Sequence, residues 1–507
     1  MACLLGIDNG LTVTKAVVFD ESGRPLSVAR RRINQIIDRP RHVERSMVEL
    51  WSETAAAIRE AIETSGRAAS DIAAISATAH GDGVYLLDAS AQPLGNGILS
   101  LDSRSGGIVE EWERDGVSDK VLQLSGQVPH ASAPSAILAW IRRHEPERFE
   151  RIGHVIACKD WLRTCLTGTI GTDLTEASTS FSNVSTQTYD IRILELLGLE
   201  GLMSALAPVS DPDEIVGFVT PLAAAATGLV AGTPVVAGIH DVTASALGVG
   251  GLSPGCVAIV AGTYSINETL TLEPRIRHQW FCRNGLRRGE WNNMAISPAS
   301  ATNYDWFLDQ LCTDMRERAE RTGQSIHAML APDIEEAFSR RSTLLYHPYL
   351  FGSPHGSQAS ASFIGLRGWH DRSDMLRAVL EGIAFNHRLH VDALRANFSI
   401  AEARLTGGIS RNPRFAQLMA DVLDMPVTTV DTEEAAAWGA ALCAGSGVGL
   451  FPTPYDDPKA ETALLATYAP REPVKTAMAK RYALHDKTSR ALADLWTDIE
   501  TLSGDPE

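Results

Sequence analysis

The sequence predicts an α/β protein of two domains, each built on a mixed β-sheet. Its 507 residues are too many for one hydrophobic core, since a domain usually takes about 100–200 residues. The first 80 residues follow the order strand-strand-strand-helix-strand, which favours a mixed sheet covered by helices. A similar strand-turn-strand pattern recurs after a Gly/Pro cluster at residues 248–255, so each half of the chain begins in the same way.

The elements of the first half follow from apolar runs and turn residues. The expected strands are residues 4–7, 16–19, 26–29 and 72–76. Asn9-Gly10 between the first two is a strong hairpin signal. A helix is expected over residues 47–64, where Leu50, Ile58 and Ile62 recur at helical spacing.

The Gly/Pro cluster predicts the boundary between a first domain, residues 1–250, and a second domain, residues 251–507. Past it we expect a strand at 256–260, a turn, and a returning strand at 266–270. The final segment, from about residue 451, contains three prolines and then a helical stretch. It is expected to form an appendage on the second domain.

Composition excludes several classes of protein. The formal charge of −17 argues against a nucleic-acid partner, which requires a basic surface. Seven scattered cysteines without a CxxC pair indicate reduced thiols. The N-terminus lacks the pattern of a signal peptide, and no stretch has the ~18 apolar residues of a membrane span. We therefore expect a cytoplasmic protein without a membrane partner. The sequence does not decide whether it forms a homodimer.

The turn after the first strand is a candidate phosphate-binding site. A glycine at position 10 lets backbone amides approach an anion, and the hydroxyls of Thr12 and Thr14 can donate to phosphate oxygens. Asp8 at the strand end can hold Mg²⁺ through water, and Lys15 completes the polar segment. The alternative is a plain hairpin with a polar tip.

Two further turns could bind a nucleotide from the second half. Gly262-Thr263 repeats the first turn, although alone it is more typical of an ordinary turn. At Gly407-Gly408 an apolar strand leads into two glycines, Asn412 and a helix over 414–423. This leaves room for a flat ligand against bare backbone and points a helix N-terminus at it. The alternative is a βα turn that needs a left-handed residue.

Polar residues that follow buried strands are the candidates for chemistry and for substrate binding. Asp241 comes just after the strand beginning at Val235 and could act as a general base, or cap the helix that follows. Four others suit a ligand with many hydroxyl groups, or form solvated loops; these are His80, Asp82, Asp102 and Arg104. His240 is interpreted as structural.

Two other kinds of site are not supported. The chain has no GxxxxGK[ST] motif, so it is not a P-loop protein. His387 and His390 lie nearly on one helical face, but no third ligand accompanies them for zinc.

Taken together, these segments resemble the FGGY family of carbohydrate kinases over almost the whole chain. Residues 8–15 and 261–265 are similar to its two phosphate motifs, and the turn at 407–408 to its adenosine motif. The long C-terminal signature is matched from Ala361 to Glu381. The N-terminal signature departs at Ile137, where the family often has Lys.

The resemblance implies two actin-like (ribonuclease-H-like) ATPase domains around a central cleft that binds ATP and Mg²⁺. It further implies that Asp241 is the catalytic base, and that His80, Asp102 and Arg104 line the sugar site. Asp82 is added by position.

Within the family the chain looks most like the L-xylulose/3-keto-L-gulonate kinases, on segments such as residues 83–88 and 295–300. The expected substrate is therefore a small sugar, a ketopentose such as L-xylulose. His80 stands where many relatives have Gln, and residues 158–162 look like erythritol kinases, so an erythritol or other polyol kinase is the alternative. From a different class, an actin-like ATPase switch would need no sugar site. A sugar-binding regulator would need a DNA-binding segment, which the sequence does not show.

Overall fold

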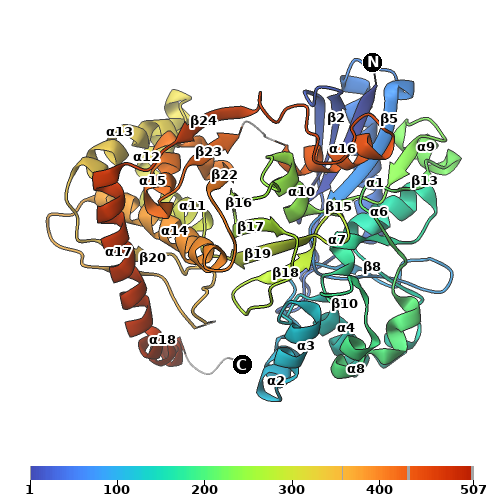
Figure 1. The fold of residues 1–507 in the computed structure, drawn as a ribbon, viewed down its shortest axis with the longest axis horizontal. Helices are drawn as coiled ribbons and strands as arrows, with labels where there is room; N and C mark the ends of the chain where they lie inside the picture. Colours follow the sequence, from blue (N-terminus) through green and yellow to red (C-terminus); the bar gives the residue numbers. More distant parts are fainter. Residues whose placement is uncertain (1, 357, 431–433, 504–507) are drawn as a thin grey trace. The chain divides into compact units, whose positions relative to one another are not determined.

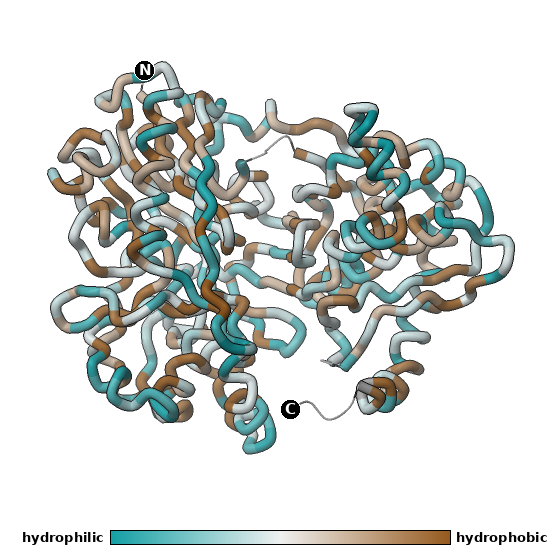
Figure 2. The backbone as a smooth tube through the Cα atoms, turned by 180° about the vertical axis from the view of Figure 1, so that it is seen from behind, coloured by the Kyte–Doolittle hydropathy of each residue, from teal (hydrophilic) through white to brown (hydrophobic). Residues whose placement is uncertain are grey.

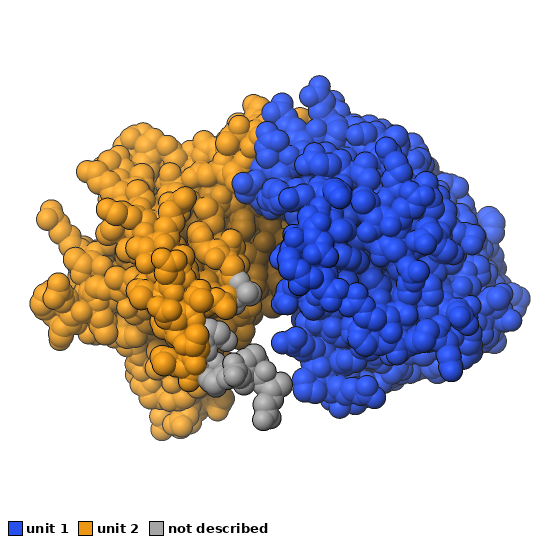
Figure 3. All heavy atoms as spheres, turned by 90° about the horizontal axis from the view of Figure 1, so that it is seen from below, with its two compact units in different colours: residues 1–253, 270–294, 432–463 blue, residues 254–269, 295–431, 464–507 orange. Residues whose placement is uncertain are grey.

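The computed structural model describes residues 2–356, 358–430 and 434–503 (Figure 1). The chain divides into two compact units, shown in separate colours in Figure 3. The first comprises residues 1–253, 270–294 and 432–463, and the second comprises residues 254–269, 295–431 and 464–507. The chain therefore first passes between units at 253/254, and two later segments return to the first unit.

One of the returning segments carries α16 (Ala435–Gly447), which packs against α10 (Asp241–Gly248). The backbones touch: a Cβ built on Gly248 would lie 2.1 Å from the Ala435 carbonyl oxygen, and one on Gly439 would lie 2.0 Å from that of Ala244. Only glycine permits this approach. The boundary expected at 250/251 would place α16 in the second domain. The small residues of α16 do not indicate in the sequence which part of the chain they pack against.

The sheet of the first unit is ordered β13-β14-β5-β1-β2-β3, with β15 also paired to β5. The strands are β1 (Cys3–Asn9), β2 (Val13–Asp20), β3 (Pro25–Arg32), β5 (Ile72–Ala79), β13 (Ile215–Phe218), β14 (Pro234–Val236) and β15 (Ile239–His240). The central strand β1 runs antiparallel to β2 and parallel to β5. All seven residues of β1 are buried, as expected for a strand covered on both faces.

The expected helix at 47–64 is confirmed as α1 (Met47–Thr64). Ser46 caps it by accepting a hydrogen bond from the backbone N–H of Glu49. The apolar face of α1, including Leu50 and Ile58, is fully buried in the same cluster as Leu5 of β1. Hydrophobic segments gather inside each unit, while many outer loops are hydrophilic (Figure 2).

The second sheet is ordered β18-β19-β17-β16-β22-β23-β24. Its strands are β16 (Cys256–Ala261), β17 (Ser265–Thr271), β18 (Phe281–Asn284), β19 (Trp291–Ser297), β22 (Glu402–Thr406), β23 (Val427–Val430) and β24 (Leu464–Tyr468). Like β1, its central strand β16 is antiparallel to the next strand and parallel to a later one, β22. The two sheets therefore repeat one topology, as the recurring strand-turn-strand pattern predicts.

The C-terminal segment, expected as an appendage on the second domain, is divided between the two units. Residues 451–463 belong to the first unit, and β24 is an edge strand of the second sheet, antiparallel to β23. Beyond it, α17 (Glu472–Ala491) is tied to α14 (Arg372–Arg395) by an ion pair between Arg481 and the buried Glu381. Of the helices in the described ranges, none is both long and apolar enough to cross a bilayer.

Candidate active site

Three parallel strands of the first sheet bring predicted residues to one edge. In the register of β1, β5 and β15, both Asn9 and His240 lie opposite Ala79. Asp8 therefore lies at the carboxyl end of β1, His80 directly follows β5, and Asp241 directly follows β15. In α/β sheets this edge is where ligands bind.

The chain before Asp241 is held by close packing and hydrogen bonds. Gly238 has φ +83°, and a Cβ on it would lie 2.2 Å from the carbonyl oxygen of Ala77, so the position requires glycine. Thr78 Oγ1 donates to the Ile239 carbonyl at 2.6 Å, and the His240 amide donates to Thr175 Oγ1 at 3.0 Å. Asp241 is thus the first residue of α10, with its side chain 28% exposed.

The environment of Asp241 suits a general base. Burial, followed by the charges of Asp8 and Asp82, raises the pKa of its carboxyl group to about 8. A carboxylate with so high a pKa is a much stronger proton acceptor than an exposed aspartate. A pKa near the working pH is what general-base catalysis requires.

Asp82 forms a charged cluster with Arg283 and His130, which were not predicted from the sequence. Its backbone is left-handed, with φ +56°, and its Oδ1 lies 3.0 Å from Arg283 Nη2 and 3.6 Å from His130 Nε2. Burial alone would raise the pKa of Asp82, but the Arg283 cation lowers it well below its usual range. His130 stacks on Phe281 with ring centroids 5.7 Å apart. Neither Arg283 nor His130 lies in a recognisable motif, so only the fold reveals them.

His80 is placed inside the unit. It is 3% exposed, and its two ring nitrogens contact the Gly81 carbonyl and the Tyr85 hydroxyl, each at 3.3 Å. Arg45 donates to the same hydroxyl at 2.6 Å. Burial, with the nearby Arg45 cation, lowers the pKa of His80 well below its usual range, so the ring is neutral.

Asp102 and Arg104 are also enclosed, with side chains 0% and 1% exposed. The Asp102 carboxylate accepts hydrogen bonds from the amides of Val43 and Arg104 and from the Arg104 guanidinium. Arg104 also pairs with Glu44 at 2.6 Å and lies over the Trp140 ring. The carboxylate oxygens are fully used by these bonds, so the pair holds protein segments together rather than offering free acceptors.

At the first turn, the candidate residues differ in burial. Thr12 is exposed, whereas Thr14 is fully buried and bonds the hydroxyl of Thr54 on α1 at 3.1 Å. The hydroxyl of Thr14 is therefore occupied inside the protein and not available to a ligand. Lys15 bridges Asp8 at 2.9 Å and Glu434 at 3.1 Å. Burial alone would lower the pKa of Lys15, but these carboxylates outweigh it and raise that pKa.

Within the second unit, the other two predicted turns lie side by side. Gly262-Thr263 follows β16 and Gly407-Gly408 follows β22, and these strands are parallel neighbours. Thr263 is exposed. Asn412 caps α15 (Pro413–Leu423) by accepting a hydrogen bond from the Arg414 amide at 2.9 Å.

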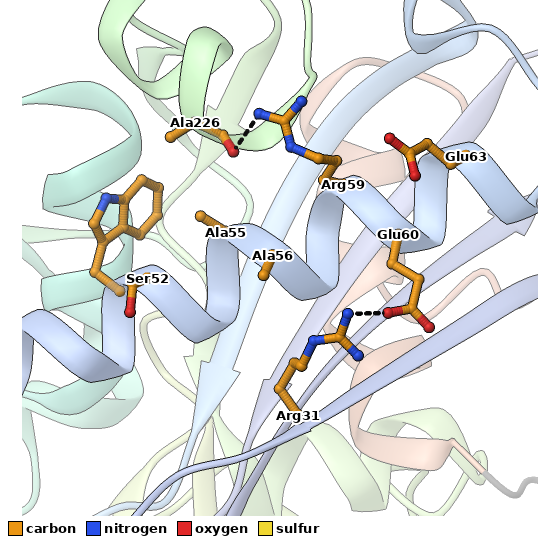
Figure 4. A pocket seen from close by; sticks show the side chains of 9 residues that line it. Arg31, Ser52, Ala55, Ala56, Arg59, Glu60, Glu63 and Ala226 are labelled. Carbon is orange, nitrogen blue, oxygen red and sulfur yellow. Dashed lines mark hydrogen bonds and ion pairs between the residues drawn. The ribbon is translucent and has the colours of Figure 1, made fainter.

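A hollow of about 510 Å³ lies elsewhere in the first unit, along α1 (Figure 4). Arg31 pairs with Glu60 at its wall, and Arg59 donates to the Ala226 carbonyl at 2.8 Å. None of the predicted site residues lines it. It is therefore not the site of the predicted chemistry.

Comparison with known proteins identifies the family of this chain. The family models for the N-terminal and C-terminal domains of the FGGY family of carbohydrate kinases match residues 3–248 and 257–448. The L-xylulose/3-keto-L-gulonate kinase of Escherichia coli (strain K12) is 34% identical over 88% of this chain and 88% of its own. The erythritol kinase of Brucella abortus (strain 2308) is 29% identical over 98% and 97%.

The predicted two-domain actin-like fold is confirmed. The structure of ligand-bound xylulose kinase from Lactobacillus acidophilus superposes with a TM-score of 0.90 at 22% identity, covering 98% of this chain and all of that one. The chain belongs to the FGGY family of carbohydrate kinases and is an ATP-dependent sugar kinase.

Proposed function

We propose that this kinase transfers the γ-phosphate of ATP to a terminal primary hydroxyl of a ketopentose such as L-xylulose. The observation that carries the proposal is the partly exposed Asp241 carboxyl group, with a pKa of about 8, at the edge of the sheet near which Asp8 also lies, one residue before the end of β1. The similarity to L-xylulose kinases supports the choice of sugar. A primary hydroxyl is the least hindered nucleophile that could reach Asp241.

In the proposed reaction, Asp241 in its ionised form accepts the proton of the sugar hydroxyl. The hydroxyl oxygen forms a bond to the γ-phosphorus while the bond to the β,γ-bridging oxygen breaks, and ADP leaves with that electron pair. The contribution of such a base is about 10²–10⁴-fold in rate.

The sugar is proposed to contact Asp82 and His130, whose side chains are 18% and 32% exposed. The ionised Asp82 would accept hydrogen bonds from sugar hydroxyls. We propose that three buried residues stabilise the protein around the sugar site without contacting the sugar, because their polar atoms are occupied by protein partners; these are His80, Asp102 and Arg104.

ATP is proposed to bind the predicted phosphate and adenosine turns. Its phosphates would contact Gly10, Thr12, Lys15, Gly262 and Thr263, and its adenosine would lie on Gly407, Gly408 and Asn412. Asp8 is proposed to hold Mg²⁺, which supplies charge neutralisation to the transferred phosphate. The residues fit such an ion: burial raises the pKa of Asp241 and the charge of Asp8 adds to the rise, and a cation would relieve the repulsion between the two carboxylates. In the described ranges no three His, Cys, Asp or Glu side chains cluster as a metal site, which suits an ion held largely by water and phosphate.

Erythritol is the second candidate substrate, since the erythritol kinase aligns with nearly the whole chain. The segment at 158–162 that resembles erythritol kinases bears on the substrate less than its sequence suggests. Its Lys159 and Asp160 are 1% and 0% exposed and pair with each other at 2.6 Å in the core. The resemblance of this segment to erythritol kinases therefore reflects packing in the core and gives no information on the sugar pocket.

The test is kcat/KM, from ADP release, for L-xylulose, D-xylulose, D-ribulose, erythritol and glycerol. We expect a preference of at least tenfold for L-xylulose, because a site built on hydroxyl contacts strongly rejects analogues that leave its polar groups unpaired. A preference for erythritol would overturn the ketopentose assignment and leave the sugar kinase intact.

A further inference from the structure

Arg283, on β18, makes three directed contacts beside the proposed base. Its guanidinium donates from Nε to Gln127 Oε1 at 3.0 Å, from Nη2 to Asp82 Oδ1 at 3.0 Å, and from Nη1 to His240 Nε2 at 3.2 Å. The side chain is 4% exposed. A planar guanidinium fixed at three points has one orientation.

The contact with His240 determines the tautomer of that ring. A guanidinium can only donate, so Nε2 must accept and carries no proton. Burial, together with the Arg283 cation, lowers the pKa of His240 to about 3, so the ring is neutral and its single proton lies on Nδ1.

The protonated Nδ1 faces Asp241. It lies 3.4 Å from Asp241 Oδ1, and within the described residues neither buried atom has a hydrogen-bond partner. A shift of a few tenths of an ångström would pair a donor and an acceptor that are both otherwise unsatisfied, and catalytic hydrogen bonds often tighten when substrate binds.

Close packing keeps the ring in this place. A Cβ built on Gly81 would lie 1.7 Å from His240 Nε2, so the backbone of Gly81 lies directly against the ring edge. The ring therefore has no room to move toward Gly81.

We propose that Arg283 is a positioning residue that acts through His240 on Asp241. It fixes the tautomer whose Nδ1–H holds Oδ1 of Asp241, and this orients the carboxylate that accepts the proton of the sugar hydroxyl. The inference rests on the proposed role of Asp241 as the base.

The first test is Arg283→Ala, with Arg287→Ala as a matched control. Arg287 follows the same strand and pairs with Asp213. We expect kcat to fall about 10²-fold in Arg283→Ala, the size of effect that a misplaced reacting group produces, with the KM for ATP unchanged. We expect added guanidinium ion, but not sodium at equal ionic strength, to restore part of kcat. The control is expected to keep wild-type kcat.

The second test changes His240, the residue that contacts Asp241, and leaves Arg283 in place. In His240→Asn the side-chain amide can donate from near the Nδ1 position, whereas in His240→Gln it reaches the Nε2 position. We expect Asn to retain kcat within about tenfold of the wild type and Gln to lose about 10²-fold.

The outcomes separate the inference from the proposed function. Wild-type kcat in a folded Arg283→Ala variant, or equal kcat in the two His240 variants, overturns the inference while Asp241→Asn remains inactive. Full activity in Asp241→Asn would instead overturn the proposed base. If Arg283→Ala does not fold, the comparison of His240→Asn with His240→Gln decides.

Discussion

Gly407 lies so close to Ala261 that a Cβ on it would be 2.3 Å from the Ala261 carbonyl oxygen. Its φ of +102° is also one that other residues rarely adopt. The contact joins the carboxyl ends of β16 and β22, where the two turns proposed to bind ATP lie. The geometry of one turn therefore depends on the other.

Replacing Gly407 by Ala is expected to lower the free energy of unfolding by about 1–3 kcal/mol and to raise the KM for ATP about tenfold. The reason is that both the strained φ and the clash with Ala261 displace the turn. For stability, Gly408→Ala is the matched control, since an added Cβ there meets no atom within 4 Å. We expect its melting temperature to remain near the wild-type value; equal losses in both variants would contradict this account.

The neighbouring threonines Thr12 and Thr14 should differ when each is changed to Val. Thr14→Val removes the bond to Thr54 inside the core and is expected to cost about 1 kcal/mol of stability with little effect on the KM for ATP. Thr12→Val is expected to weaken ATP binding and leave stability unchanged, since its side chain is exposed. Thermal melts and ATP titrations distinguish the two, and the reverse pattern would contradict the assignment of Thr14 to the core and of Thr12 to the ATP site.

The raised pKa of Asp241 predicts how activity depends on pH. A base works only when ionised, so kcat/KM for the sugar should rise about tenfold per pH unit up to about pH 8 and then level off. Asp82 does not contribute to this rise, because Arg283 holds its pKa far below that range. A profile that is flat from pH 5 to 9 would mean that Asp241 is already ionised at pH 5.

The same pKa predicts a stability effect of Asp241→Asn. The folded-state pKa is above that of the unfolded chain, near 3.8, so the stability linked to this carboxyl group is fully present below pH 4 and is lost as pH rises through 8. An amide at this position does not ionise. The variant should therefore gain stability relative to the wild type as pH rises, by at least on the order of 1 kcal/mol at pH 9, since one pKa unit corresponds to about 1.4 kcal/mol. Denaturant unfolding at pH 5, 7 and 9 measures the gain, and a gain that shrinks with pH would have the wrong sign.

Helical spacing and apolar runs predicted the helices and hairpins that form from neighbouring residues. The spacing of Leu50, Ile58 and Ile62 was sufficient for α1, and the apolar runs around Asn9-Gly10 for the first hairpin. The recurring turn at Gly262 likewise indicated the second sheet. The return of α16 to the first unit could not be predicted, because its small residues bury equally well against any close backbone.

The same limit applies to the candidate site. Asp8, near the end of a buried strand, and Asp241, directly after one, could be selected from the sequence. The saturation of Asp102 by Arg104 and the Val43 amide depends on a segment 59 residues away, and the contact of Arg283 with Asp82 spans 201 residues. No spacing in the sequence encodes such contacts. The sequence therefore predicted which edge of the sheet carries the site, but it did not predict that Arg283 contacts Asp82 there.

ADP release with saturating ATP and L-xylulose, compared between the wild type and Asp241→Asn, tests the central claim most directly. We expect sugar-dependent ADP release by the wild type and a loss of about 10²–10⁴-fold in kcat for a variant that still folds. ADP release by the wild type that does not depend on any sugar, or wild-type turnover in Asp241→Asn, would contradict the account.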